Sequence, residues 1–555
     1  MDWQRNLLIS AIVVVFALLF VRWMDFNDQR EAAVVESRSN ELVVPEAGGQ
    51  GVGSPADSGD TGIPAVATAG GSDVDAARTT NTRLVTVTTD TLELTIDTYG
   101  GDIVRSALRE YPESQKTPDK PFVMLNRTSD ATYIAQSGLI GSNGTDTNSA
   151  RPTFRVVANS FALSPDSDTL EVNLVTEQGA VTITKQFVLR RGDYVVEVNY
   201  LVDNRSAESW QAAMFGQIQR DTHEPPASDG VGMAPYLGAA ITTPDSHFKK
   251  VTFDDLNESS FKTQKVGGWV AMVQHYFISA WVPNQDVENS FTLKKLGNRD
   301  LYTLGFVSPA VTVAAGEQGE LSSRFYVGPK DQYRLEEISQ YLDLTVDYGW
   351  LWWVAKPIFY VMTLIHSLVG NWGWSIILLT VLIKTLFFKL SATSYRSMAK
   401  MRKLQPEMAR LKDMYGDDRQ KLSQEMMNFY KKEKVNPMGG CLPMLVQMPV
   451  FIALYWVLFE SVELRHSPWI LWITDLSVKD PYFVLPILNG ICMFITTQLQ
   501  PEPPDPMQAK VMKIMPVAFS FMFAFFPAGL VLYWTVNSLL SIIQQLIVTR
   551  QIEKG

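Results

Sequence analysis

The hydrophobic positions of this chain follow two patterns, one in each half. Across residues 83–330 apolar and polar residues alternate, as they do at Leu92, Leu94 and Ile96. A second alternating segment contains Tyr194, Val196, Val198, Tyr200 and Val202. Short alternating strands that are separated by Gly, Asn and Asp turns, without helical spacers, predict an antiparallel β-sandwich. After Trp350 long apolar runs replace the alternation, which indicates a polytopic α-helical membrane region.

A separate apolar run precedes the sandwich at residues 7–21. Trp3 and Trp23 bracket it at a helical separation of ~30 Å, about one hydrocarbon thickness. No small-x-small cleavage site follows, so residues 1–26 are interpreted as an uncleaved signal-anchor transmembrane helix rather than a cleaved signal peptide. Residues 27–82 are rich in Gly, Ala, Ser, Asp and Pro and are interpreted as a flexible acidic linker.

Two neighbouring segments, 350–370 and 371–390, are each long enough to span a bilayer. The basic segment 391–440 that follows is expected in the cytoplasm by the positive-inside rule, whereas the sandwich is expected outside. Only one of the two segments can then cross. The first carries polar residues at helical spacing, namely Lys356, Tyr360, Thr363 and Ser367. Residues 331–370 are therefore interpreted as a connector with an amphipathic interfacial helix, and 371–390 as the span.

Further spans are predicted at 442–460 and 482–499. The apolar stretch 512–547 is longer than one crossing, and Phe526-Pro527-Ala528-Gly529 interrupts it, so two short spans joined by an outer turn are expected. This gives six crossings, five of them in a core at 371–555, with both termini in the cytoplasm.

The basic loop at 391–434 is predicted to form a cytoplasmic helical hairpin. The first helix has apolar residues at three- and four-residue spacing, namely Met401, Leu404, Met408, Leu411 and Tyr415. Pro406 should kink that helix, Gly416 should end it, and Asp417 or Asp418 should cap the next one.

Composition excludes several classes of function. The 58 acidic residues outnumber the 48 basic ones, so the net charge of −10 argues against a nucleic-acid substrate. The two cysteines lie in apolar runs, and the five histidines have no zinc-site spacing. Neither a P-loop nor a GxSxG motif is present. We therefore expect no enzyme activity, no catalytic residue, no cofactor and no metal.

Lys384 is the unusual residue of the predicted spans. A lysine at the centre of a membrane helix costs roughly 2.5–3.5 kcal/mol, so it indicates a function unless it snorkels to the headgroups. Other polar residues are expected at a similar depth, namely Thr380, Gln447, Asn537, Ser541 and Gln545, with Tyr533 and Trp534 above them. These side chains could hydrogen-bond between helices and hold the helices together. Their position around a cation instead favours a water-filled cavity that is open to the cytoplasm.

Several motifs resemble one family of membrane proteins. They are the run from Asn436 to Pro449 (NPMGGCLPMLVQMP), the run from Ala399 to Pro406 (AKMRKLQP), the run from Asp505 to Gln508 (DPMQ), and the run from Gly529 to Trp534 (GLVLYW). Together they resemble the YidC/Oxa/Alb family of membrane protein insertases, and the large outer domain resembles the Gram-negative members. The resemblance covers nearly the whole chain.

The resemblance implies a function in inserting inner-membrane proteins and assisting their folding, alone or with the Sec translocon. It implies a hydrophilic substrate groove in which Thr380, Gln447, Tyr533 and Trp534 match substrate-contacting positions. The family usually has arginine at the position of Lys384, and lysine keeps the charge but loses the bidentate fork. The outer domain is implied to be a β-supersandwich.

The same resemblance implies a set of partners. These are nascent membrane proteins, the Sec translocon with its auxiliary subunits, components of the signal-recognition pathway, and membrane lipids. Some relatives reach the ribosome through a long basic tail, but this chain ends at Arg550-Gln-Ile-Glu-Lys-Gly555. The implied location is the bacterial inner membrane, with the large domain in the periplasm.

Two other functions are compatible with the residues. A transporter or channel would also place a cation mid-membrane, but it would be expected to show inverted repeats, and none is visible between 371–460 and 482–547. Measurement of solute flux in liposomes separates it from an insertase. A membrane-tethered periplasmic binding module would lose all activity when residues 83–328 are deleted, whereas an insertase should largely keep it.

Overall fold

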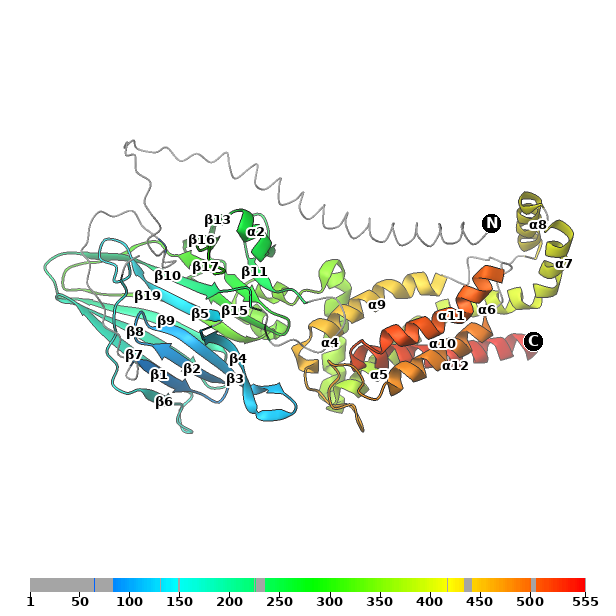
Figure 1. Ribbon diagram of the computed structural model, residues 1–555, viewed down its shortest axis with the longest axis horizontal. Helices are drawn as coiled ribbons and strands as arrows, with labels where there is room; N and C mark the ends of the chain where they lie inside the picture. Colours follow the sequence, from blue (N-terminus) through cyan, green and yellow to red (C-terminus); the bar gives the residue numbers. More distant parts are fainter. Residues whose placement is uncertain are drawn as a thin grey trace. The chain divides into compact units, whose positions relative to one another are not determined.

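The computed structural model describes Pro64 and residues 83–554, apart from residues 130, 148–149, 224, 226–234, 417, 434–441 and 501–505. The predicted signal anchor at 1–26 lies outside the described residues, as does the linker at 27–82 except for Pro64. From Arg83 onward the chain forms first a β-domain and then a helical region (Figure 1).

The β-domain consists of two packed sheets. In spatial order the first, 11-stranded sheet contains β13 (Phe261–Val266), β16 (Glu288–Lys295), β17 (Tyr302–Val307), β10 (Trp210–Arg220), β5 (Thr132–Ile140), β4 (Thr117–Arg127), β3 (Asp102–Ser114), β2 (Leu92–Asp97), β1 (Leu84–Thr88) and β6 (Ser160–Ala162), with β18 (Val311–Val313) paired to β10. The 8-stranded sheet contains β12 (Lys249–Val251), β11 (Gly238–Ile241), β14 (Val270–Val273), β15 (Phe277–Val282), β19 (Gln318–Pro329), β9 (Val195–Asn204), β8 (Val181–Arg190) and β7 (Thr169–Gln178). Described strand pairs are antiparallel except β1 with β6, which is parallel.

The alternation in sequence corresponds to the buried face of each sheet. In β9, Val198 and Tyr200 are fully buried, whereas Leu201 between the inward positions is 37% exposed. The two inner faces meet in an aromatic core, where Trp281 of β15 and Phe306 of β17 lie 6.1 Å apart between ring centroids. The antiparallel sandwich predicted from the sequence is confirmed.

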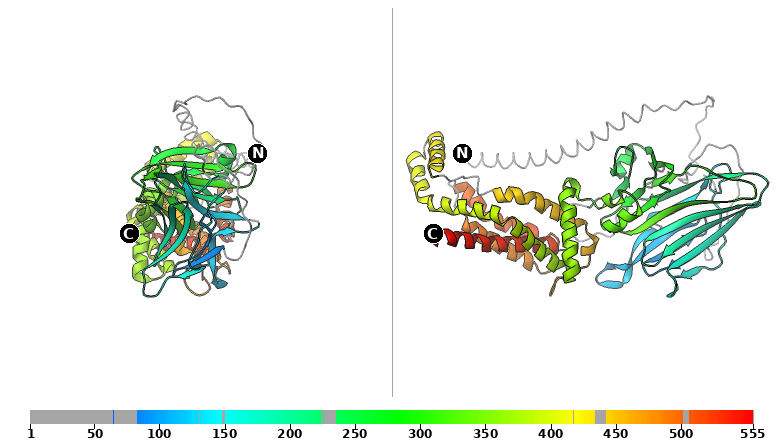
Figure 2. Two further views of the ribbon diagram at one scale, coloured as in Figure 1. Left: turned by 90° about the vertical axis from the view of Figure 1, so that its left-hand side faces the viewer. Right: turned by 180° about the vertical axis from the view of Figure 1, so that it is seen from behind.

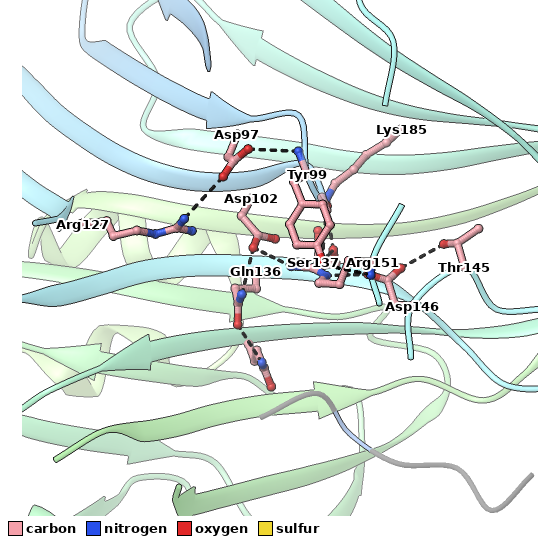
Figure 3. Close-up of polar contacts among 12 residues, drawn as sticks. Asp97, Tyr99, Asp102, Arg127, Gln136, Ser137, Thr145, Asp146, Arg151 and Lys185 are labelled. Atoms are coloured by element: carbon pink, nitrogen blue, oxygen red, sulfur yellow. Dashed lines mark hydrogen bonds and ion pairs between the residues drawn. The ribbon is translucent and has the colours of Figure 1, made fainter. Parts of the chain in front are cut away.

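A charged cluster lies buried between the sheets, near the turn from β2 to β3 (Figure 3). Arg151 forms ion pairs with both Asp102 and Asp146, and all three side chains are at most 7% exposed. Gly100 has a φ of +78°, and a Cβ at this position would lie 2.4 Å from the Arg151 guanidinium carbon. The glycine therefore provides both the left-handed turn and the space for the arginine.

Lys185 of β8 belongs to the same cluster and is fully buried. Its Nζ donates hydrogen bonds of 3.0 Å to the backbone oxygens of Gly100 and Ser137. Burial lowers the pKa of Lys185 to about 7, and neighbouring Asp102 opposes that shift. Both carbonyls also accept from Arg151, so they keep a partner when the lysine is replaced.

The position of Lys185 predicts a pH-dependent stability of the β-domain. In an unfolded chain a lysine has a pKa near ~10.4, so between about pH 7 and pH 10 the unfolded state binds more protons than the folded state. The free energy of local unfolding should therefore rise with pH across this window, by up to about 1.4 kcal/mol per unit. Hydrogen exchange of the β8 amides in the intact protein, corrected for intrinsic exchange rates, measures this free energy of local unfolding. Lys185→Met should abolish the slope, and an unchanged slope would contradict this assignment.

The helical elements follow the sandwich. The short ones are α2 (Phe253–Glu258), which lies within the β-domain, α3 (Gln332–Ile338), and the 3-10 turns η1 (Leu342–Thr345), η2 (Gly349–Leu351) and η4 (Val462–Leu464). The longer ones are α4 (Trp352–Val369), α5 (Trp372–Leu386), α6 (Phe388–Lys403), α7 (Gln405–Tyr415), α8 (Arg419–Lys432), α9 (Leu442–Glu460), α10 (Val484–Leu499), α11 (Pro506–Phe523) and α12 (Ala528–Lys554).

The hairpin region differs from its prediction in two ways. The span expected at 371–390 ends at Leu386, and α6 leaves it with a bend of 67° around Phe387. The first hairpin helix is not one kinked helix, because α6 ends before Leu404 and Pro406 lies in the first turn of α7. A proline in that position loses no helical hydrogen bond, so a new helix begins there instead. Asp418 caps α8, as one of the two predicted candidates.

By length and composition, few described helices can cross a membrane alone. Gly349–Val369 and Ala528–Gln551 qualify, the bent pair α5 and α6 qualifies as a broken span, and Gln447–Glu460 and Val484–Leu499 are shorter apolar helices. Although α4 is long enough, it runs across α5, α9, α10 and α12 rather than alongside them (Figure 2). Its Lys356 pairs at 2.6 Å with Asp343 of the connector, so part of the polar stripe faces protein instead of water.

Hydrogen bonds join the end of the β-domain to the Glu460 end of α9. Lys330, directly after β19, forms an ion pair with Glu460, and the two residues are only 3% and 4% exposed. The His275 ring lies 2.9 Å from the backbone oxygen of Phe459 through Nε2. Burial lowers the pKa of His275 to about 3, so the neutral ring donates this bond. These contacts assign the Glu460 end of α9 to the same side as the β-domain.

Candidate functional site

Lys384 lies on α5 and reaches two other helices. Its Nζ donates a 2.8 Å hydrogen bond to Oγ of Ser541 on α12 and lies 3.5 Å from Oε1 of Gln447 on α9. The side chain is therefore directed into the helical region, where burial of a charge without a hydrogen-bond or ion-pair partner would cost several kcal/mol. The two neutral oxygens offset part of that cost by hydrogen bonding.

The amide of Gln447 extends the contact to a fourth residue. Its Nε2 donates a 2.5 Å hydrogen bond to Oδ1 of Asn537. Asn537 and Ser541 are four residues apart on α12, so they share one face, as the sequence spacing predicts. We call Lys384, Gln447, Asn537 and Ser541 the polar cluster. Each of its side chains is half-buried.

The charge of the polar cluster is not balanced within the described chain. Among the described residues no carboxylate forms an ion pair with Lys384, and the two oxygens that it contacts are neutral. This arrangement differs from the buried charges of the β-domain, where Arg151 faces two aspartates. A cation that is held only by neutral acceptors remains able to attract a carboxylate.

Aromatic side chains border the polar cluster toward the β-domain side of α12. Tyr533 is 1% exposed and lies beside Gln447. Trp534 is half-buried, with its ring centroid 4.3 Å from that of Phe451 and 4.1 Å from that of Phe523. Both aromatic residues precede Asn537 and Ser541 along α12.

Two predicted site residues lie away from the cluster. Thr380 is 1% exposed, and its hydroxyl donates to the Ile376 oxygen of its own helix at 2.6 Å. Gln545 is 4% exposed and donates from Nε2 to the Leu499 oxygen of α10. In this structure neither side chain hydrogen-bonds with Lys384, and the place of both residues in a groove stays a prediction.

Sequence reasoning missed two side chains near the site. Gln544, next to Gln545, is 6% exposed and ties α12 to the Phe388 oxygen at the start of α6. Tyr395 of α6 lies close to Ser541. A second polar residue beside Gln545 was visible in the sequence, but Tyr395 lies in the segment assigned wholly to the hairpin. In the described part of the chain no group of three or more His, Cys, Asp or Glu side chains is arranged to hold a metal ion.

Comparison with known proteins places both halves of the chain in a single family. Residues 84–361 match the YidC periplasmic domain, and residues 364–555 match the 60Kd inner membrane protein family. The membrane protein insertase YidC of Cellvibrio japonicus is 53% identical over 562 aligned residues, which cover 100% of this chain and 99% of that protein. The chain belongs to the YidC family of membrane protein insertases.

A second relative has the same full coverage. The membrane protein insertase YidC of Saccharophagus degradans is 50% identical, with 100% of both chains covered. Among solved structures, the crystal structure of an active YidC insertase with its first transmembrane domain resolved has 18% identity and a TM-score of 0.37, covering 84% of this chain and 92% of that one. The YidC-family assignment makes this an inner-membrane protein whose β-domain is periplasmic. The Glu460 end of α9 is then the periplasmic end.

Proposed function

We propose that this insertase receives segments of nascent membrane proteins at the polar cluster, through a hydrophilic groove between α5, α9 and α12 that is open to the cytoplasm and the bilayer. The observation that carries the proposal is Lys384, a cation from one helix held by neutral side chains from two others. No bond is made or broken in this process, and no nucleotide takes part.

The physical task is the passage of a polar flank. An apolar segment of ~20 residues already prefers lipid, at about −0.3 to −0.6 kcal/mol for each strongly apolar residue. A charged flank, in contrast, meets a barrier of about 10–17 kcal/mol at the bilayer centre. Polar side chains within the membrane shorten the stretch of hydrocarbon that the flank must cross, and Lys384 attracts an acidic flank. At 4 Å and an effective dielectric constant of ~20, one such pair contributes ~4 kcal/mol before desolvation.

Photocrosslinking during synthesis of a small membrane protein tests this proposal. A photoreactive residue at Gln447 or at Trp534 should form adducts with the client before its release. The same residue at Phe521 of α11, which is 71% exposed, serves as a lipid-facing control. Adducts from Phe521 that equal those from both groove positions would show that clients enter elsewhere.

The topology proposed with this function has six crossings, both termini in the cytoplasm and α4 on the outer leaflet. The hairpin of α7 and α8 is then cytoplasmic, which agrees with the basic charge of 391–440. The Sec translocon, its auxiliary subunits and signal-recognition components are proposed partners of the hairpin and the β-domain. Anionic lipid headgroups are a further proposed partner of the basic hairpin.

Ser367 provides a direct test of whether α4 crosses the membrane. This residue is exposed near the end of α4, so it lies in the periplasm if the helix is interfacial and in the cytoplasm if it spans. In a variant with Cys441 and Cys492 replaced by serine, Ser367→Cys should react with an impermeant thiol reagent added from outside. Met414→Cys in α7, which is 66% exposed, should react only after permeabilisation. The reverse pattern would establish a spanning α4. Thr363 is less suitable because it is only partly exposed, whereas Ser367 is exposed.

A further inference from the structure

The loop between α9 and α10, residues 461–483, covers the periplasmic ends of several helices, and we call it the outer loop. Asn371 at the start of α5 donates from Nδ2 to the oxygens of Pro468 and Trp469, both at 3.2 Å. At the start of α12, the Ala528 amide donates to the Val478 oxygen at 2.7 Å. The outer loop is therefore fixed to α5 and α12 at the level where these helices begin.

The polarity of the outer loop is inverted relative to that of a loop in water. Asp475 and Asp480 are 6% and 1% exposed, and each accepts hydrogen bonds from groups of the loop itself. Leu471 is 79% exposed and Tyr482 is 67% exposed. A water-exposed loop normally presents its carboxylates and hides large apolar side chains, because burial of a charge costs free energy and burial of an apolar group releases it.

Backbone strain coincides with the exposed apolar residues. Among the described residues four non-glycine residues have a positive φ, and three belong to the outer loop, namely His466, Leu471 and Phe483. Leu471 has a φ of 53°, and Phe483, which is 42% exposed, has a φ of 56°. Glycine or asparagine adopts this conformation with less strain in a turn that faces water. The side chain of Leu471 gains little burial within the protein to offset the strain.

Aromatic pairs mark the depth at which the outer loop lies. Trp469 makes an edge contact with Trp374 of α5 at 6.0 Å between ring centroids, and Trp472 makes one with Tyr482 at 6.3 Å. Tryptophan and tyrosine concentrate at the headgroup level of a bilayer. Leu471 lies between the two loop tryptophans, and Phe483 leads directly into the lipid-facing side of α10, where Ile487 is 56% exposed.

We propose that the outer loop is a lipid anchor, in which Leu471, Tyr482 and Phe483 insert into the outer leaflet at the boundary between headgroups and acyl chains. The phospholipid is the occupant that offsets the backbone strain and covers the exposed apolar side chains. This anchor holds the periplasmic ends of α5, α10 and α12 at a fixed depth. It is independent of client binding at the polar cluster, since it lies at the opposite end of α9 from Gln447.

Fluorescence quenching in the full-length protein tests the anchor. In a background with Cys441→Ser and Cys492→Ser, Leu471→Cys is labelled with a bimane fluorophore, and the protein is reconstituted in vesicles of phosphatidylethanolamine and phosphatidylglycerol. Nitroxide-labelled phospholipid should quench the label, and aqueous iodide should not. Label at Ile491→Cys, 51% exposed on α10, is the lipid control, and label at Asn298→Cys, in the exposed turn after β16, is the water control.

A second label at Tyr482→Cys guards against a local effect of the first substitution. Quenching by lipid nitroxide at both positions, at the level of the Ile491 control, supports the anchor. Iodide quenching equal to that at Asn298 would overturn it in favour of a loop in water. Protection from both quenchers would also overturn it, because a second protein chain would then cover the loop.

Discussion

Deletion of residues 396–432 is expected to reduce membrane protein insertion to background while the protein remains folded in the membrane. In the described part of α7 no side chain is buried, and the hairpin exposes Met414 and Met427 by 66% and 51%. Unbranched thioethers adapt to many apolar partners, and the surrounding lysines and arginines attract anionic headgroups. The deletion leaves the contact between Gln544 and Phe388 in place, so α6 stays attached to α12.

Protease protection of a newly synthesised client measures the effect of the deletion. A variant in which a Gly/Ser segment of equal length replaces the hairpin is the matched control for loop closure, and it should be equally inactive. Thermal unfolding of both variants in detergent should resemble that of the intact protein. Normal insertion by either variant would remove the hairpin from client recruitment.

Substitution of Lys384 is expected to separate clients by the charge of their flanks. Lys384→Ala should slow insertion of clients with acidic tails and spare clients with neutral tails and strongly apolar spans, because lipid partitioning already drives the latter. If only a third of the ~4 kcal/mol attraction reaches the rate-limiting step, the rate falls about tenfold. Lys384→Glu should be worse for acidic tails, and Lys384→Arg should be tolerated because the sign and the position of the charge persist.

Lys389→Ala is the matched control, since it removes one positive charge at an exposed site of α6, away from the polar cluster. Protease protection of paired acidic-tail and neutral-tail clients is the readout. A lysine that merely snorkels to the headgroups predicts wild-type insertion of both clients by Lys384→Ala. Equal and undiminished insertion would therefore exclude Lys384 from the mechanism.

The β-sandwich could be predicted because the pattern that defines its strands is local in the sequence. Alternation in β2 and β9 depends only on residues two positions apart, and the structure buries those faces. The charged cluster of the β-domain was not predicted, because Asp102, Arg151 and Lys185 are distant in sequence. A signal was nevertheless present. Lys185 is in phase with the inward-facing apolar residues of β8, so a charge was placed at a core position.

The candidate site was predictable in part for the same reason. Helical spacing correctly groups Asn537 with Ser541, but it cannot distinguish a side chain that meets a cation from one that packs against a neighbouring helix. Gln545 continues the same spacing and instead donates to a backbone oxygen of α10. The bend at Phe387 also depends on packing, since neither proline nor glycine occurs at that position. Tertiary contacts decide such features, and a single sequence does not contain them.

The ion pair between Lys330 and Glu460 has a consequence for truncation experiments. A protein that lacks residues 83–328 keeps Lys330, whereas a slightly longer deletion leaves Glu460, which is buried in the intact protein, without its cation, at a cost of up to about 3–5 kcal/mol. Loss of insertion after the longer truncation would then result from a destabilised α9 and would not show that the periplasmic domain takes part in insertion. Pairing that truncation with Glu460→Gln removes the orphaned charge, and recovery of insertion would identify the cause.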